Sequence, residues 1–163
     1  MVNSENGRPA DQACEPYFVL VAWRPEMAAD DEPAGPGGQA ERFLADWQRR
    51  CLPLPLCSAP SELVYAAYTL WCQLQSVPKP APPNSFGTSV RRAGFHKARH
   101  LIRMPGAVNC SQHAVLHPPG KQLKSGAPLD RSAAAFGASL NGWRAAVGNL
   151  AERSLAATSE GQG

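Results

Sequence analysis

Residues 58–74 decide the fold, and their sequence is SAPSELVYAAYTLWCQL. Ser58 or Ser61 can cap a helix here, and Pro60 suits its first turn. The apolar side chains then recur every three or four residues, which is the period of one helical face. These side chains are Leu63, Val64, Ala67, Tyr68, Leu70, Trp71 and Leu74. The stretch therefore predicts a helix with one face in a core.

A first helix is expected before this stretch, from Gln39 to Arg50. Its apolar face is formed by Ala40, Phe43, Leu44 and Trp47, which fall at i, i+3, i+4 and i+7. The sequence Leu-Pro-Leu-Pro-Leu at 52–56 ends it, because proline cannot continue the helical hydrogen-bond ladder.

A third, short helix is expected from Asn84 to Arg92, after a proline-rich connector at 77–83 and with Gly94 just past its end. Phe86 and Val90 lie 40° apart on its inward side at about 100° per residue. The side chains on its opposite side are Ser85, Thr88, Arg91 and Arg92.

A basic strand is expected next, from Phe95 to Arg103. Alternation puts Lys97, Arg99 and Arg103 on one of its faces. Beyond Met104 the pattern weakens, so residues 109–128 are expected to be a loop. Residues 132–157 carry apolar side chains at helical spacing but three glycines, which favours a frayed helix or a dimerising segment.

The 163 residues include 16 prolines and 14 glycines, which favours a compact core with flexible flanks. We expect a mainly α protein with one small, winged helix-turn-helix-like domain and a short β wing at 39–108. Residues 1–38 are expected to be a disordered arm and linker with a short strand at 17–23. Residues 109–163 are expected to be a loop followed by the C-terminal helix.

Charge is unevenly distributed along the chain. Residues 1–62 hold ten acids and five arginines, and residues 130–163 hold three acids and three arginines. Residues 63–129 hold eight lysines and arginines and no acid. Such a stretch is typical of a surface that binds a polyanion, most commonly nucleic acid. The alternative is a solvated basic surface without a partner.

These segments resemble the C-terminal domain of phage and plasmid primase-helicases. The resemblance covers about residues 39–108 and is carried by FLADW at 43–47, SELVYAAYTLWC at 61–72 and RRAGF at 91–95. It implies a winged helix that binds DNA at a replication origin. By position, Arg91 and Arg92 would lie on the recognition helix, and Lys97, Arg99 and Arg103 on the wing. Three features depart from the family pattern. These are an extra valine at 64, the proline-rich connector and the lack of a clear glycine turn in the wing before residues 104–108.

The catalytic parts of that family are absent from this sequence. The segment Gly120-Lys121-Gln122 lacks the spacing and the hydroxyl of a phosphate-binding loop. We therefore expect a non-enzymatic DNA-binding protein without a cofactor. The alternatives are a protein-interaction or scaffold module and a decayed fragment of a primase-helicase.

Several other classes are disfavoured. The longest apolar run, at 17–23, is far short of the roughly 20 residues of a membrane span. The polar first sixteen residues do not suggest a secretory signal, and five irregularly spaced cysteines favour reduced thiols in the cytoplasm. The four histidines and the cysteines do not show the spacing of a four-ligand zinc site, so no metal is expected.

The predicted partner is duplex DNA, with no membrane contact, and the C-terminal helix is compatible with a homo-oligomer. Ser85, Thr88, Arg91 and Arg92 are expected in the major groove. Lys97, Arg99 and Arg103 are expected on the flanking phosphates.

Overall fold

The computed structural model describes residues 36–124 and 126–159. The chain divides into two units, Met1–Glu32 and Pro33–Gly163, and every described residue belongs to the second. The strand expected at 17–23 and nearly all of the expected N-terminal arm lie outside the described residues.

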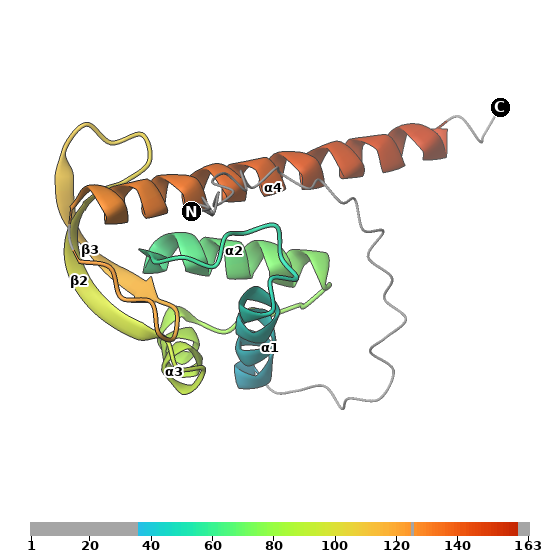
Figure 1. The fold of residues 1–163 in the computed structure, drawn as a ribbon. Helices are drawn as coiled ribbons and strands as arrows, with labels where there is room; N and C mark the ends of the chain where they lie inside the picture. Colours follow the sequence, from blue (N-terminus) through green and yellow to red (C-terminus); the bar gives the residue numbers. More distant parts are fainter. Residues whose placement is uncertain (1–35, 125, 160–163) are drawn as a thin grey trace, which may run out of the picture. The chain divides into compact units, whose positions relative to one another are not determined.

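The described residues form a small, mainly α domain with four helices and three strands (Figure 1). In chain order these are α1 (Pro36–Gln48), β1 (Ala59–Pro60), α2 (Ser61–Leu74), α3 (Pro83–Arg92), β2 (His96–Arg103), β3 (Cys110–His117) and α4 (Ala127–Ser159). The strands form one antiparallel sheet in the order β1-β3-β2.

The predicted central helix is confirmed as α2, but it begins at Ser61 and not at Ser58. Ala59 and Pro60 instead pair with β3, and Pro60 has an extended backbone with φ −55° and ψ 133°. No side chain caps the helix, because Pro60 occupies the N-cap position. The Ser58 hydroxyl, expected as a possible cap, contacts His117 at 2.8 Å. Pairing with β3 therefore moves the start of the helix past both Ala59 and Pro60.

One core cluster joins the helices. Phe43 of α1 is fully buried, and its ring meets those of Tyr68 and Trp71 edge-on at centroid distances of 5.6 and 6.0 Å. Phe86 of α3 stacks on Tyr68 at 4.8 Å. Tyr68 also accepts a 3.0 Å hydrogen bond from the Ala81 backbone N–H, which ties the proline-rich connector to α2. The aromatic residues thus fix three helices and the connector together.

The loop expected at 109–128 is wrong over its first part. Residues 110–117 form β3, which pairs along its whole length with β2 from His96↔His117 to Arg103↔Cys110. The predicted domain end at 108 therefore falls inside a hairpin. Cys110–Gln112 are exposed and polar, so the apolar signal is confined to the buried end of the strand at Val115 and Leu116.

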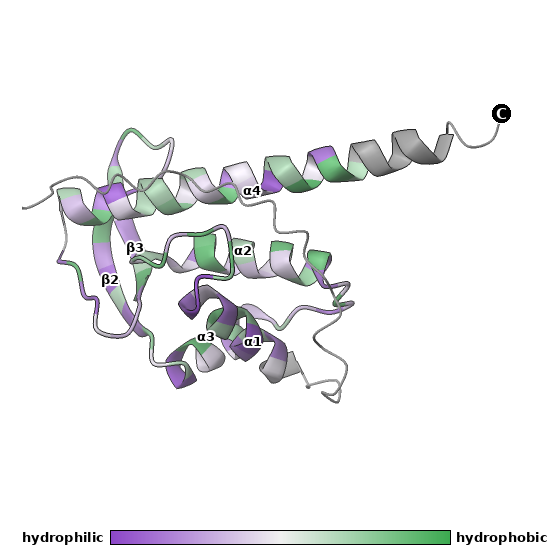
Figure 2. Cartoon of the chain, turned by 45° about the vertical axis from the view of Figure 1, so that its right-hand side comes forward, coloured by the Kyte–Doolittle hydropathy of each residue, from purple (hydrophilic) through white to green (hydrophobic). Residues whose placement is uncertain are grey.

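The C-terminal helix extends further than expected and belongs to the domain. Leu129 and Ala133 of α4 are buried against Ile102 and Val115 of the hairpin in a second apolar cluster. Phe136 joins the main core, where its ring meets Trp47 at 5.6 Å. Figure 2 shows green, apolar residues on α2 and α4 where these helices lie side by side. No helix in the described part of the chain combines the length and apolarity of a membrane span.

The central position of Phe43 generates a prediction for stability. Phe43→Ala should lower the free energy of unfolding by about 3–5 kcal/mol, because it leaves a cavity among three aromatic rings. Leu101→Ala, at a side chain that is 56% exposed, should change it by less than about 0.5 kcal/mol. Urea unfolding of both variants measures this, and equal losses would contradict the described core.

Candidate nucleic-acid interface

Helix α3 is anchored by its inward side chains. Phe86 and Val90 are 4% and 1% exposed, as their spacing predicts, and Ser89 is buried beside them. The helix ends where expected, because Gly94 adopts a left-handed φ of +82° and the Phe95 N–H donates to the Val90 carbonyl at 3.2 Å. On the opposite face of the helix, Ser85, Arg91 and Arg92 are exposed.

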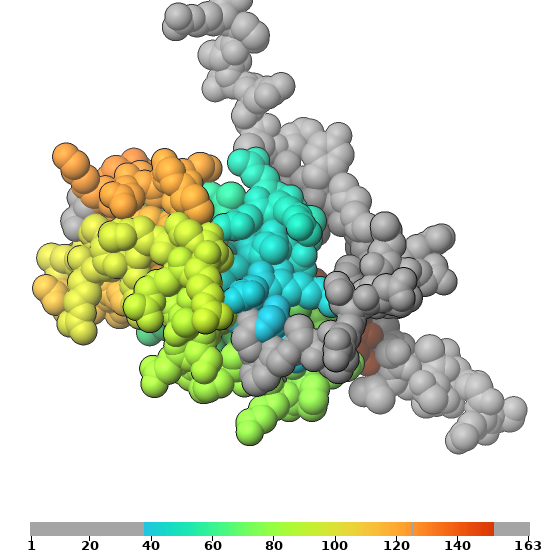
Figure 3. Space-filling view, turned by 90° about the horizontal axis from the view of Figure 1, so that it is seen from below, coloured from blue at the N-terminus to red at the C-terminus, as the bar shows by residue number. Residues whose placement is uncertain are grey.

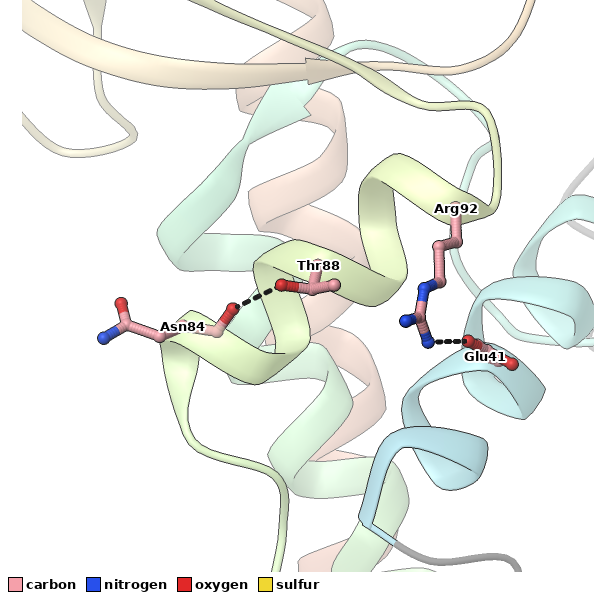
Figure 4. Close-up of polar contacts among 4 residues, drawn as sticks. All are labelled: Glu41, Asn84, Thr88 and Arg92. Atoms are coloured by element: carbon pink, nitrogen blue, oxygen red, sulfur yellow. Dashed lines mark hydrogen bonds and ion pairs between the residues drawn. The ribbon is translucent and has the colours of Figure 1, made fainter.

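Helix α1 holds the C-terminal end of α3. The Gln48 side-chain amide donates a 2.9 Å hydrogen bond to the Ala93 carbonyl. The Arg92 guanidinium reaches across to the Glu41 carboxylate of α1 at 3.5 Å (Figure 4). Both side chains of this ion pair are exposed, at 70% and 46%, and such pairs contribute little to stability. A phosphate can therefore compete with Glu41 for Arg92.

The four predicted residues of α3 lie on its outer side, but they differ in exposure and in hydrogen bonding. Ser85, Arg91 and Arg92 are exposed, whereas Thr88 is half-buried. The Thr88 hydroxyl donates to the Asn84 carbonyl one turn earlier at 3.3 Å, so its proton is already used (Figure 4). Its oxygen can still accept a hydrogen bond.

The basic strand is confirmed as β2, and its outward face carries the predicted cations. Lys97, Arg99 and Arg103 are exposed and share one face with Leu101, whereas Ile102 on the other face is fully buried. The three cations span about 20 Å at the usual rise of a strand. This length suits contact with several phosphates along one nucleic-acid strand.

The loop between β2 and β3 contains a glycine turn inside residues 104–108, whereas the sequence-based expectation concerned the residues before this segment. Gly106 has a φ of +82°, and the Ala107 N–H donates to the Met104 carbonyl at 2.9 Å. The glycine lies after the strand, at the centre of a six-residue connection at 104–109.

Helix α4 supports the loop end of the hairpin. A Cβ atom on Gly137 would lie 2.7 Å from Cγ of Pro105, so glycine is required for this close approach. The Asp130 carboxylate accepts a 2.9 Å hydrogen bond from the backbone N–H of Arg103. Two residues of α4 thus fix the end of the strand that carries the cations.

Helix α3 and strand β2 are neighbours in space as well as in sequence. Figure 3 shows their atoms together on one side of the molecule, α3 in lime green and β2 in yellow, beside α1 in cyan. Figures 1 and 2 both show α4 on the other side of the domain from α3. The predicted site residues therefore come from two adjacent elements. Helix α4 contacts the hairpin at its loop end, through Gly137 and Asp130.

Sequence reasoning missed a cluster of histidines. The strand pairing places His96 opposite His117 and His100 opposite His113, so all four histidines share one face of the hairpin. His113 contacts the Glu62 carboxylate of α2 at 2.7 Å. Burial, and then the neighbouring His100 and His96, lower the pKa of His117 below its ordinary value. Strand alternation alone could have aligned these residues, had β3 been recognised.

Among residues 36–124 and 126–159, no group of three or more histidine, cysteine or acidic side chains is arranged to hold a metal ion. Comparisons of the chain with protein-family models, curated proteins and solved structures find no match. The resemblance to primase-helicases therefore stays a prediction from the sequence.

The contact between α4 and the hairpin generates a second prediction. Asp130→Ala removes the acceptor of the Arg103 N–H and should lower the free energy of unfolding by about 1 kcal/mol. The exchange of the Arg103 amide proton with solvent should become faster. Asp130→Asn keeps an oxygen at this place and is the matched control. Unchanged exchange in Asp130→Ala, measured by NMR, would show that α4 does not hold the end of β2.

Proposed function

We propose that the chain is a non-enzymatic DNA-binding protein whose domain is a winged helix. In this proposal α3 enters the major groove of a duplex, and the β2–β3 hairpin is the wing that follows the phosphate backbone. Arg91, Arg92 and Ser85 contact bases or phosphates from α3, and Thr88 contributes an acceptor. Lys97, Arg99 and Arg103 contact the flanking phosphates.

The order of the elements is the first support. A helix and a short strand precede two helices, and a hairpin follows directly after the second of them. The first strand pairs with β3, which places β3 in the centre of the sheet. A helix-turn-helix with an appended β-hairpin has these parts, with its second helix as the reader of the groove.

The single observation that carries the proposal is the placement of like charge on adjacent elements. Five cations, two at the end of α3 and three along one face of β2, are exposed on neighbouring elements. No acid occurs between residues 63 and 129. Among the described residues, Glu41 forms an ion pair with Arg92, and Asp130 accepts a hydrogen bond from the backbone of Arg103. Such a surface attracts a polyanion and releases counterions when it binds one.

A role in the replication of a phage or plasmid rests on the sequence resemblance. A cytoplasmic location is compatible with binding to such DNA. Both belong to the proposal. Neither is needed for the DNA contact itself, which is tested on the purified chain.

The test is fluorescence-anisotropy binding to a duplex of about 20 base pairs at two salt concentrations. If two to five cations contact phosphates, affinity should fall by a factor of about 10 to 500 between 50 and 200 mM salt. Arg91→Glu should weaken binding and reduce the salt slope by about one or more. Arg144→Glu makes the same charge change on the exposed surface of α4 and should weaken binding much less.

Two results would contradict the proposal. One is the absence of binding at 50 mM salt by a folded chain. The other is an equal loss of affinity in Arg91→Glu and Arg144→Glu, because this would indicate general attraction to positive charge and no interface at α3.

A second candidate function, a protein-interaction module, is favoured by a groove between α2 and α4. The groove has a volume of about 360 Å³ and is lined by Ala66, Thr69, Leu70, Gln73, Arg144, Val147 and Gly148. The apolar seam of α4 also continues past the core, from the buried Leu140 to Leu150, which is 57% exposed. A second copy of the chain is the partner that we propose here. Apolar association of this kind would depend little on salt, which separates it from phosphate contact.

A further inference from the structure

The four histidines of the chain lie on one face of the β2–β3 hairpin, and two of them converge. Because His117 pairs with His96, the strand pairing does not place His100 directly opposite His117. Their rings nevertheless meet at a centroid distance of 5.0 Å and an interplanar angle of 79°. Their Nε2 atoms are 3.0 Å apart. Two imidazole nitrogens from opposite strands thus lie within hydrogen-bond distance of each other.

The second nitrogen of His117 is fixed by the residues around it. Its Nδ1 atom lies 2.8 Å from the hydroxyl of Ser58, the residue that precedes β1 in the chain. Ser58 is also placed to donate its single proton to the Lys121 carbonyl at 3.5 Å. In that arrangement the Ser58 oxygen accepts the Nδ1–H of His117. The lone pair of His117 then lies on Nε2 and points toward His100.

We propose that His100 and His117 form a two-histidine chelate for a divalent transition metal, with Zn²⁺ as the preferred ion and water in the remaining positions. This inference is independent of DNA binding. Zinc binds histidine nitrogen at about 2.0–2.1 Å, which places two nitrogens of a tetrahedral site about 3.3 Å apart. The observed separation of 3.0 Å is close to this value, and binding would turn the two nitrogens from each other toward the shared ion.

The surroundings provide the other requirements of such a site. A ligating histidine normally has its second nitrogen hydrogen-bonded, which fixes the tautomer and the ring orientation, and Ser58 does this for His117. His100 is half-buried, so an ion can approach from its side. Binding needs the Nε2 lone pair of His100 as well, so the proton of this ring must lie on Nδ1.

The two remaining histidines are not ligands in this proposal. The His96 ring stacks beside His117 at a centroid distance of 6.1 Å and an angle of 26°, so it lies alongside the pair. His113 faces Glu62 and Ser111, with contacts of 2.7 and 2.6 Å. Because the protein supplies two ligands, the affinity should be below that of a structural zinc site, and the ion should exchange with solution.

The test uses the untagged full-length chain with Cys14→Ser, Cys51→Ser and Cys110→Ser, which removes thiols that compete for zinc. Zn²⁺ is titrated in a calorimeter, and the imidazole resonances of the four histidines are followed by NMR. His100 and His117 should shift together at one equivalent of zinc. His100→Gln should weaken binding at least tenfold, whereas His113→Gln, at a half-buried histidine directly opposite, should change it less than about twofold.

Ser58→Ala tests the positioning role of the hydroxyl and should weaken zinc binding by about tenfold, the usual effect of losing such a hydrogen bond. Far-UV circular dichroism of each variant checks that it is folded. No binding up to about 1 mM Zn²⁺ in a folded chain would overturn the proposal and leave a hydrogen bond between the two rings. Equal losses in His100→Gln and His113→Gln would also overturn it.

Discussion

The Trp47 indole stacks on the Phe95 ring with centroids 5.1 Å apart and planes within 13°. This contact joins α1 to the point where α3 ends and β2 begins. The indole N–H of Trp47 donates to the Pro55 carbonyl at 3.0 Å, so the ring is held by the segment after α1 as well. The direction in which the strand leaves α3 is set by this stack, and the relative placement of the two basic elements follows from it.

The same aromatic core determines what the surface can do. Phe86 and Val90 bury one side of α3, which turns Arg91 and Arg92 outward beside the first residues of β2. Helix α4 fixes the other end of that strand through Asp130. The cations are therefore carried by supported elements, and little backbone conformational entropy needs to be lost in the proposed contact with phosphates.

The helices were predictable because each has a local signal of its own. Phe43 and Trp47 follow the helical period in α1, and Gly94 marks the end of α3. Strand β3 was not predictable in this way, because its outer half is polar and exposed and pairing with β2 defines it. The same non-local pairing moved the start of α2, since Ala59 and Pro60 join β3. It also aligned four histidines that are scattered in the sequence.

The residues of the candidate interface divide along the same line. Strand alternation and helical spacing placed Lys97, Arg99 and Arg91 on exposed faces without knowledge of the fold. The ion pair of Arg92 with Glu41 depends on the angle at which α1 crosses α3. No pattern in the sequence predicts this crossing angle. The close approach of Gly137 to Pro105 likewise depends on the tertiary structure. From the sequence alone, this glycine indicated only a position that destabilises a helix.

The most direct test of this account is to map the duplex-binding surface by NMR, residue by residue. A short duplex is added to the ¹⁵N-labelled chain, and the amide shifts are followed at low salt. The account predicts that the largest changes fall on α3 and on β2, with Arg91 and Arg99 among them, and that the exposed turns of α4 change least. Changes that centre on α4 and the α2–α4 groove, with α3 unaffected, would contradict it.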